Sequence, residues 1–211
     1  MKIVCISDTH THELQMTHPV PEGDVLVFAG DMSYHGELNK IMYFNQWLGT
    51  LPHAHKIVIA GNHDRSFEDH RRFEARTLLT NCTYLEDQET IIEGVKFYGS
   101  PVQPWFYDWA FNKRRGEEIK KYWDAIPDDT NVLITHGPVF GILDKVIPGN
   151  EYVGCKDLKK RIETLPDLKL HVCGHIHCGH GRRKIRGVTY VNASICDEDY
   201  SPIQKPIVVE I

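Results

Sequence analysis

Short runs of apolar residues, rich in valine and isoleucine, recur along the chain between polar or turn-forming residues. Runs of this length and composition are typical of buried strands. They predict strands at 2–6, 24–28, 56–59, 95–98, 132–134, 170–173, 188–191 and 207–211.

Amphipathic stretches lie between several of these strands. In residues 38–51 the apolar side chains recur at spacings of three and four, the period of a helix with one buried face. Similar stripes predict helices at 66–79, 113–125 and 155–165. Strands that alternate with helices favour an α/β layered domain. No long helix separates the last two strands, so we expect a partly antiparallel sheet and a two-sheet core flanked by helices.

The 211 residues contain no repeat, low-complexity tract or linker-like segment, which predicts a single domain over 1–211. Apolar residues make up 41% and no run approaches the roughly 18 apolar residues of a membrane span, so we expect no membrane partner. Twenty-four Lys and Arg against 29 Asp and Glu give a net charge of −5. The chain therefore has no overall positive field for nucleic acid.

The first ten residues, MKIVCISDTH, lack the basic and apolar regions of a secretory signal, so we expect a cytoplasmic protein. Six cysteines without a C-x-x-C pair are typical of small buried groups in a reducing compartment. The 13 histidines are the unusual feature, because imidazole is the commonest metal ligand and exchanges protons near neutral pH.

Polar side chains of the kinds that bind metals follow five of the predicted strands. The carboxyl ends of strands in an α/β sheet form a common crevice, so short loops from several strands meet there. Glycines at 30, 61, 137 and 174 stand beside these side chains, where the chain turns sharply or approaches an ion. The candidate ligands are Asp8, His10, Asp31, Asn62, His136, His175 and His177.

This set contains two carboxylates, one amide and four imidazoles, which is too many for one tetrahedral zinc ion. It suits two adjacent divalent ions, with one carboxylate, most naturally Asp31, between them. Oxygen and nitrogen donors without a thiolate favour Mn²⁺, Fe or Zn²⁺, with Ni²⁺ and Mg²⁺ as further candidates.

In this order, the motifs D-x-H, G-D, G-N-H-[DE], a strand-terminal His-Gly and G-H-x-H resemble the calcineurin-like binuclear metallophosphoesterase superfamily. The resemblance implies a four-layer α/β/β/α sandwich with a mixed sheet core. It also implies that Asp31 bridges two metals, whose remaining ligands are Asp8, His10 and His177 for one and Asn62, His136 and His175 for the other.

A narrower resemblance extends over nearly the whole chain. The segments 56–63, 99–106, 109–112, 135–138, 153–155, 170–177 and 191–194 look like the small metallophosphoesterase-domain-containing phosphodiesterase subgroup. That subgroup includes cyclic-nucleotide phosphodiesterases. Some of its animal members lack one histidine of G-H-x-H and are weak enzymes, whereas this sequence keeps both His175 and His177.

We therefore expect a metal-dependent phosphoester hydrolase that prefers phosphodiesters, such as cyclic nucleotides. A hydroxide bridging the two metals would attack phosphorus. The resemblance assigns Asn62 to a metal and leaves His63 free to protonate the leaving oxygen. Asp64 would orient His63 through the second ring nitrogen.

Other functions remain open. A nuclease or a phosphomonoesterase could use the same centre, and the net negative charge argues against long nucleic acid more than against short oligonucleotides. A non-catalytic partner-binding module of this fold would show an eroded ligand set, and a metal-storage protein would bind metal without turnover. The expected substrate partner is a small phosphoester, with nucleotides as one class.

Aromatic residues are densest between 105 and 111, where they could form a wall for a nucleobase or pack in the core. These residues are Trp105, Phe106, Tyr107, Trp109 and Phe111. The basic run 182–186 fits the solvated face of a hairpin better than an anion site. His180, close to His177 in sequence, could approach the centre, although an ordinary structural histidine fits this position better.

Overall fold

The computed structural model describes all 211 residues and contains two main β-sheets. The first sheet has the order β13-β1-β2-β3-β4, in which β13 is antiparallel and the other strands are parallel. These strands are β1 (Lys2–Ile6), β2 (Val25–Ala29), β3 (His55–Ile59), β4 (Thr83–Tyr84) and β13 (Ile207–Glu210).

The second sheet has the order β11-β12-β10-β9-β6-β5, with four parallel central strands and an antiparallel strand at each edge. Its strands are β5 (Gln88–Ile92), β6 (Val95–Ser100), β9 (Val132–Thr135), β10 (Leu170–Cys173), β11 (Gly181–Ile185) and β12 (Val188–Asn192). A small separate ribbon pairs β7 (Gln103–Pro104) with β8 (Asn112–Lys113).

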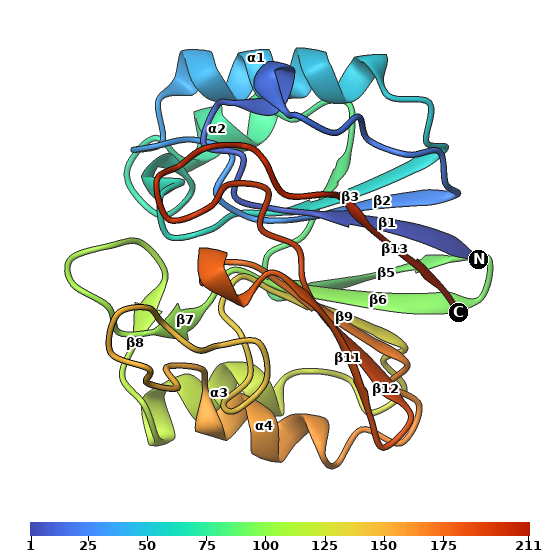
Figure 1. Cartoon of the computed structure of the whole chain (residues 1–211), viewed down its shortest axis with the longest axis vertical. Coiled ribbons are helices and arrows are strands. Elements are labelled where there is room, and N and C mark those ends of the chain that lie inside the picture. Colours follow the sequence, from blue (N-terminus) through green and yellow to red (C-terminus); the bar gives the residue numbers. More distant parts are fainter.

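Helices cover the outer faces of both sheets, as Figure 1 shows. The first sheet carries α1 (Leu38–Thr50) and α2 (Arg72–Leu78), and the second carries α3 (Glu117–Asp124) and α4 (Lys156–Ile162). Short 3-10 turns occur at Glu13–Gln15, Arg65–Phe67 and His177–Gly179. The predicted four-layer α/β/β/α sandwich is therefore confirmed. None of the helices has the length and apolar composition that crossing a bilayer requires.

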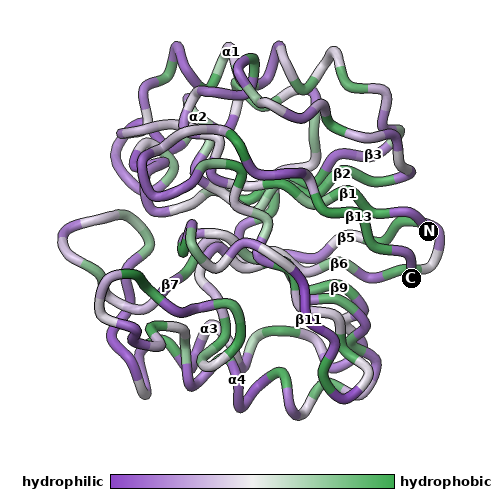
Figure 2. Tube along the Cα trace, in the orientation of Figure 1, coloured by the Kyte–Doolittle hydropathy of each residue, from purple (hydrophilic) through white to green (hydrophobic).

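Three apolar clusters hold the layers together. The central one lies between the sheets and includes Val27 and Ile57 of the first sheet and Val172 of the second, all fully buried. Two outer clusters fill the space between each sheet and its helices; α1 contributes Phe44 to one and α3 contributes Trp123 to the other. The strands are therefore apolar on both faces, which Figure 2 shows as hydrophobic segments through the middle of the molecule.

All eight predicted strands are present, and the segments that sequence periodicity missed are mostly edge strands. Strand β11 is almost entirely exposed and carries the basic run, so it has no apolar run to reveal it. The predicted helix at 66–79 is instead a 3-10 turn followed by α2. The last two predicted strands do not pair with each other, because β12 belongs to the second sheet and β13 to the first.

The two sheets meet at one end. An isolated parallel bridge joins Ser7, just after β1, to Ser194, just after β12. The amide of Ser7 donates to Ala193 at 2.9 Å and the amide of Ile195 donates to Ser7 at 2.9 Å. The loops that follow the central strands of both sheets consequently converge at this junction.

Candidate metal centre

Loops after β1, β2, β3, β9 and β10 bring all seven predicted ligands to this junction. Several of them have an unusual backbone: Asp8, His10, Asp31 and His175 are non-glycine residues with φ between 44° and 67°. Such left-handed conformations cost free energy and persist where the surrounding structure imposes them, which is frequent at functional sites. The backbone here is thus shaped to direct side chains toward one point.

The donor atoms fall into two adjacent groups. In one, His177 Nε2 lies 3.3 Å from His10 Nε2 and 3.5 Å from Asp8 Oδ1. In the other, Asn62 Oδ1 lies 2.9 Å from His136 Nε2 and 2.7 Å from His175 Nδ1. The ligand atoms of Asp8, His10 and His177 all lie within 4.8 Å of one another, as do those of Asp31, His136 and His175, so each of these groups is compact enough to surround a single ion.

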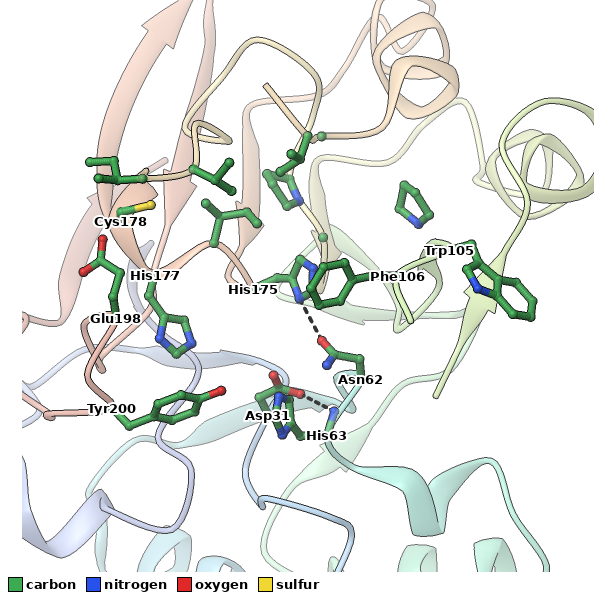
Figure 3. Close-up of a pocket in the computed structure, with 18 of the residues that line it drawn as sticks. Asp31, Asn62, His63, Trp105, Phe106, His175, His177, Cys178, Glu198 and Tyr200 are labelled. Atoms are coloured by element: carbon green, nitrogen blue, oxygen red, sulfur yellow. Dashed lines mark hydrogen bonds between the residues drawn. The ribbon is translucent and has the colours of Figure 1, made fainter. Parts of the chain in front are cut away.

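Asp31 lies between the two groups. Its Oδ2 is 3.8 Å from His10 Nε2 on one side and 3.2 Å from His136 Nε2 on the other. Its other oxygen accepts a hydrogen bond from the amide of His63 at 2.8 Å, which holds the carboxylate in this orientation (Figure 3). The geometry is that of a carboxylate shared by two neighbouring sites.

Backbone carbonyls orient three of the imidazoles. Nδ1 of His136 lies 2.8 Å from the carbonyl oxygen of Ala29, and Nδ1 of His177 lies 2.7 Å from that of Asp197. Nδ1 of His10 is 3.2 Å from the carbonyl of Ser33. A carbonyl can only accept, so Nδ1 carries the proton and Nε2 presents its lone pair to the centre, the arrangement typical of metal-binding histidines. The donor set therefore fits divalent cations.

The pKa shifts of the buried groups also indicate a site for cations. Burial opposes ionisation of Asp31, but the neighbouring histidines His136 and His63 outweigh it and hold the pKa of Asp31 well below its usual range. Burial likewise opposes protonation of His136, yet the Asp31 carboxylate raises the pKa of His136 to about 9. Buried ionised carboxylates are stable only with positive charge close to them. Without a metal ion, protonated histidines supply that charge.

Two glycines make the close approach of these loops feasible. A Cβ at Gly174 would lie 2.0 Å from Asp8 Oδ2, and a Cβ at Gly61 would lie 2.2 Å from Asp31 Oδ1. Only glycine fits at either position. Gly137 shows no such constraint from the surrounding protein, because a Cβ there would meet nothing closer than 3.5 Å.

His63 stands at the edge of the donor set. Its Nδ1 lies 2.8 Å from the carbonyl oxygen of Tyr34, so that nitrogen is the donor and Nε2 is left free. The ring stacks on Trp109, with centroids 4.1 Å apart, and meets the edge of His10 at 4.7 Å. His63 is therefore held in place and lines the cavity beside the centre.

The predicted pairing of Asp64 with His63 is wrong. The fully buried Asp64 carboxylate accepts hydrogen bonds from the amides of Asp31, Ser33 and Gly61, each at 2.9 Å, and from Ser33 Oγ at 2.7 Å. Burial and the nearby Asp31 carboxylate raise the pKa of Asp64 to about 6, although these hydrogen bonds oppose the rise. Asp64 thus joins the loop after β2 to the loop after β3, and the Tyr34 carbonyl orients His63.

A cavity of about 450 Å³ opens beside the centre (Figure 3). Aromatic and aliphatic side chains form much of its wall, including Phe106, Ile147 and Val153. Polar side chains of Arg115 and Glu198 also reach it. Such a space is of the size and character that accommodates a small organic group.

Some aromatic residues of the segment 105–111 line the cavity, as expected of a wall for a nucleobase, and others pack in the core. Trp105 and Phe106 line the cavity and are about half exposed, at 58% and 47%. Phe111 is only 4% exposed and packs in the apolar cluster between the first sheet and its helices. Tyr107 points to solvent with 75% exposure. The basic run lies on exposed β11, and His180 does not line the cavity.

Sequence patterns missed Tyr200, which stands over the centre. Its ring centroid lies 4.8 Å from that of His10 and 5.3 Å from that of His177. It has a left-handed backbone, with φ of 59°. A single tyrosine in the irregular segment after β12 carries no periodic or motif signal, so only the fold could reveal this position.

Comparisons with known proteins place the chain among phosphoesterases. A family model described as calcineurin-like phosphoesterase matches residues 1–179. Human metallophosphoesterase domain-containing protein 1 is 42% identical, over 100% of this chain and 71% of its own length. A UPF0046 protein of Caenorhabditis elegans is 38% identical, over 100% of this chain and 75% of its own length.

Solved structures share the fold at low identity. One aligns with a TM-score of 0.63 and 17% identity over 90% of this chain and 89% of its own. A putative 5'-nucleotidase from Staphylococcus aureus, in complex with alpha-ketoglutarate, aligns with a TM-score of 0.57 and 10% identity. That alignment covers 100% of this chain and 54% of the nucleotidase. At these identities the likeness concerns the fold alone.

The role of Asp64 as a joint between loops can be tested by Asp64→Ala in metal-free protein. We expect the free energy of unfolding to fall by at least about 3 kcal/mol, since several buried amides lose their acceptor at about 1–3 kcal/mol each. Urea denaturation measures this. Asp69→Ala, which removes a half-buried carboxylate paired with Arg71, is the control and should cost less than about 1 kcal/mol. Unchanged stability in Asp64→Ala would contradict the assignment.

Proposed function

The chain belongs to the calcineurin-like phosphoesterase family, whose members are metal-dependent phosphoester hydrolases, and from this premise we propose that it prefers phosphodiesters, with small nucleotides as the substrate class. The observation that carries the proposal is the cavity of about 450 Å³ that continues from the metal centre. A diester has an organic group that stays on phosphorus and can occupy this space while the leaving oxygen faces His63, whereas a monoester has only its leaving group.

We assign Asp8, His10 and His177 to one ion, Asn62, His136 and His175 to the other, and Asp31 to both. The donor distances and the carbonyl-held imidazoles described above support this assignment. When bound, two divalent ions supply positive charge for the phosphate and activate water for attack on phosphorus. Oxygen and nitrogen donors without a thiolate make Mn²⁺ our first choice of metal.

His63 is our candidate for the general acid. The Tyr34 carbonyl accepts its Nδ1 proton whether the ring is neutral or charged, so Nε2 is the nitrogen that gives a proton to the departing ester oxygen. Its amide donates to Asp31, so the backbone of the acid and the shared carboxylate are joined directly. The position of His63 is therefore coupled to that of Asp31.

The cavity wall is suited to a substrate that carries an aromatic group, such as a nucleobase. Phe106 packs its edge near His175, with centroids 5.7 Å apart, and therefore stands beside the second ion's ligands. A base stacked on Phe106 or Trp105 would contribute binding energy remote from phosphorus, which helps to position the reacting group. The complete donor set also argues against a non-catalytic module, which would have no need of it.

Metal stoichiometry tests the shared ligand. Elemental analysis of Mn²⁺-loaded protein should find about two ions per chain, and Asp31→Ala should lose both because its carboxylate contributes to each site. Asn62→Ala should lose mainly one. Asp69→Ala, outside the centre, should keep both. A stoichiometry in Asp31→Ala equal to that of the parent would refute the bridging assignment.

His63→Ala tests the general acid. We expect the variant to keep its metal yet lose roughly 10²- to 10⁴-fold in kcat with a nucleoside leaving group. The deficit should be much smaller with bis-p-nitrophenyl phosphate, because p-nitrophenolate leaves without protonation. Steady-state rates and metal content measured on the same preparations check this. Metal loss in parallel with activity would make His63 a ligand instead.

Substrate preference tests the phosphodiesterase proposal directly. With Mn²⁺ at one pH, kcat/KM for bis-p-nitrophenyl phosphate and for cyclic nucleotides should exceed kcat/KM for p-nitrophenyl phosphate. The second substituent of bis-p-nitrophenyl phosphate and the nucleoside of a cyclic nucleotide can contact the cavity wall. Binding energy remote from phosphorus that positions the reacting group lowers the free energy of the transition state and so raises kcat/KM. A monoester preference of about tenfold, equivalent to about 1.4 kcal/mol, would overturn the proposal in favour of a phosphomonoesterase.

A substitution in the cavity wall tests the same substrate preference in a second way. Phe106→Ala should raise KM for cyclic nucleotides by roughly tenfold while changing p-nitrophenyl phosphate little, since stacking on a base contributes about 1–3 kcal/mol. Tyr107→Ala, the solvent-exposed neighbour outside the cavity, is the matched control.

A further inference from the structure

Trp109 belongs to the aromatic segment but does not line the metal-centre cavity. It lines a separate polar hollow together with His35, Arg65 and Glu68. His63, in contrast, lines the metal-centre cavity. Trp109 therefore contacts the proposed acid from the side that substrate does not occupy.

The stack around Trp109 is well defined. Its ring lies 4.1 Å from the ring of His63 at 30° between planes. The ring of His35 is nearly parallel to Trp109, at 5.7 Å and 4°, and the guanidinium of Arg65 lies 5.3 Å from the indole. Side chains on several sides thus restrict the indole, so it presents a fixed face to His63.

Hydrogen bonds attach the Trp109 loop to the segment that carries His63. The amide of Ala110 donates to the carbonyl of Asn62 at 3.2 Å. The amide of Phe111 donates to the Glu68 carboxylate at 2.7 Å, and Arg65 donates to the carbonyl of Asp108. The loop between β7 and β8, which projects at the left side of Figure 1, is therefore attached to the loop after β3 that carries Asn62 and His63.

One hydrogen bond does not fix an imidazole ring. The contact between Nδ1 of His63 and the Tyr34 carbonyl still allows the ring to swing about that axis. The face of Trp109 and the edge of His10 restrict this swing from two directions. Proton transfer needs the donor and the ester oxygen within about 2.6–3.2 Å, and a displacement of about 1 Å can cost 10²-fold in rate.

We infer that Trp109 is a positioning residue for proton transfer to the leaving group: its indole holds the His63 ring so that Nε2 faces the departing oxygen. This inference rests on the proposed function, in which His63 is the acid. It separates Trp109 from Trp105 and Phe106, which belong to the substrate cavity. Trp109 should accordingly affect kcat and leave KM unchanged.

The kinetic test compares Trp109→Leu with Trp109→Phe, using a cyclic nucleotide and bis-p-nitrophenyl phosphate with Mn²⁺. Trp109→Leu should lower kcat for the cyclic nucleotide by roughly 10- to 100-fold, with KM and metal content unchanged. Its effect on bis-p-nitrophenyl phosphate should stay below about threefold, because that leaving group needs no proton. Trp109→Phe, which keeps an aromatic face, should recover most of the loss.

A double-mutant comparison and a control complete the kinetic test. In a His63→Ala background, Trp109→Leu should change kcat by less than about twofold, since the two residues act through one step. Tyr107→Leu, a substitution of an exposed aromatic in the same loop, should behave as the parent. Equal losses with both substrates, a raised KM, or independent effects of the two substitutions would overturn the inference.

A spectroscopic measurement separates this inference from the proposed function. The ring protons of His63 should show upfield NMR shifts from the stacked indole, and Trp109→Leu should remove these shifts while Tyr107→Leu retains them. Unaltered His63 shifts in Trp109→Leu would overturn the positioning role. Failure of the parent to hydrolyse any diester would refute the proposed function instead, and the NMR result would still decide whether the indole of Trp109 stacks on the His63 ring.

Discussion

Two carboxylates, those of Asp8 and Asp31, remain ionised although they are almost completely buried. Ionised groups without compensation are very costly in a protein interior. Here Asp31 receives an amide hydrogen bond from His63 and faces imidazoles on two sides. Asp8 receives the amide of His175 at 3.0 Å and the hydroxyl of Ser194 at 2.9 Å. The loops around the centre supply this compensation, and a pair of cations would complete it.

The two-sheet architecture makes such compensation available. Ser194 comes from the second sheet and Asp8 from the first, so their hydrogen bond crosses the junction of the sheets. The glycines at 61 and 174 permit the loops to approach the carboxylates, and the left-handed residues turn the chain toward them. Each of these loops follows a strand whose side chains are buried in the apolar core between the sheets. That core therefore holds the loops, with their left-handed residues, in place.

The proposed acid is oriented without a carboxylate partner. A carbonyl from Tyr34, an indole from Trp109 and the edge of His10 surround His63. The carboxylate next to it in sequence, Asp64, instead binds backbone amides of two loops. The orientation of the His63 ring therefore comes from a carbonyl and two neighbouring rings, while the Asp31 carboxylate accepts from the backbone amide of His63.

Much of the fold and of the ligand set could be predicted from the sequence. Buried parallel strands are apolar on both faces, so their Val and Ile runs are visible locally, and ligands that directly follow such runs must meet at one sheet edge. That reasoning named seven side chains as candidate ligands, and the structure brings all seven to the junction of the sheets. It could not place exposed edge strands such as β11, because solvent-facing residues carry no apolar pattern.

Contacts between distant segments were decided by the tertiary structure alone. Adjacency in sequence suggested that Asp64 orients His63, but the tight turn after β3 points the two side chains in different directions. Tyr200 lies over the centre and Trp109 stacks on His63, and both belong to loops without periodicity. The other aromatic residues of the segment 105–111 line the cavity, pack in the core or face solvent. The sequence by itself determined which chemistry is present, because donor types and strand runs are local properties. Which groups touch depends on how the two sheets join, and no local pattern contains that information.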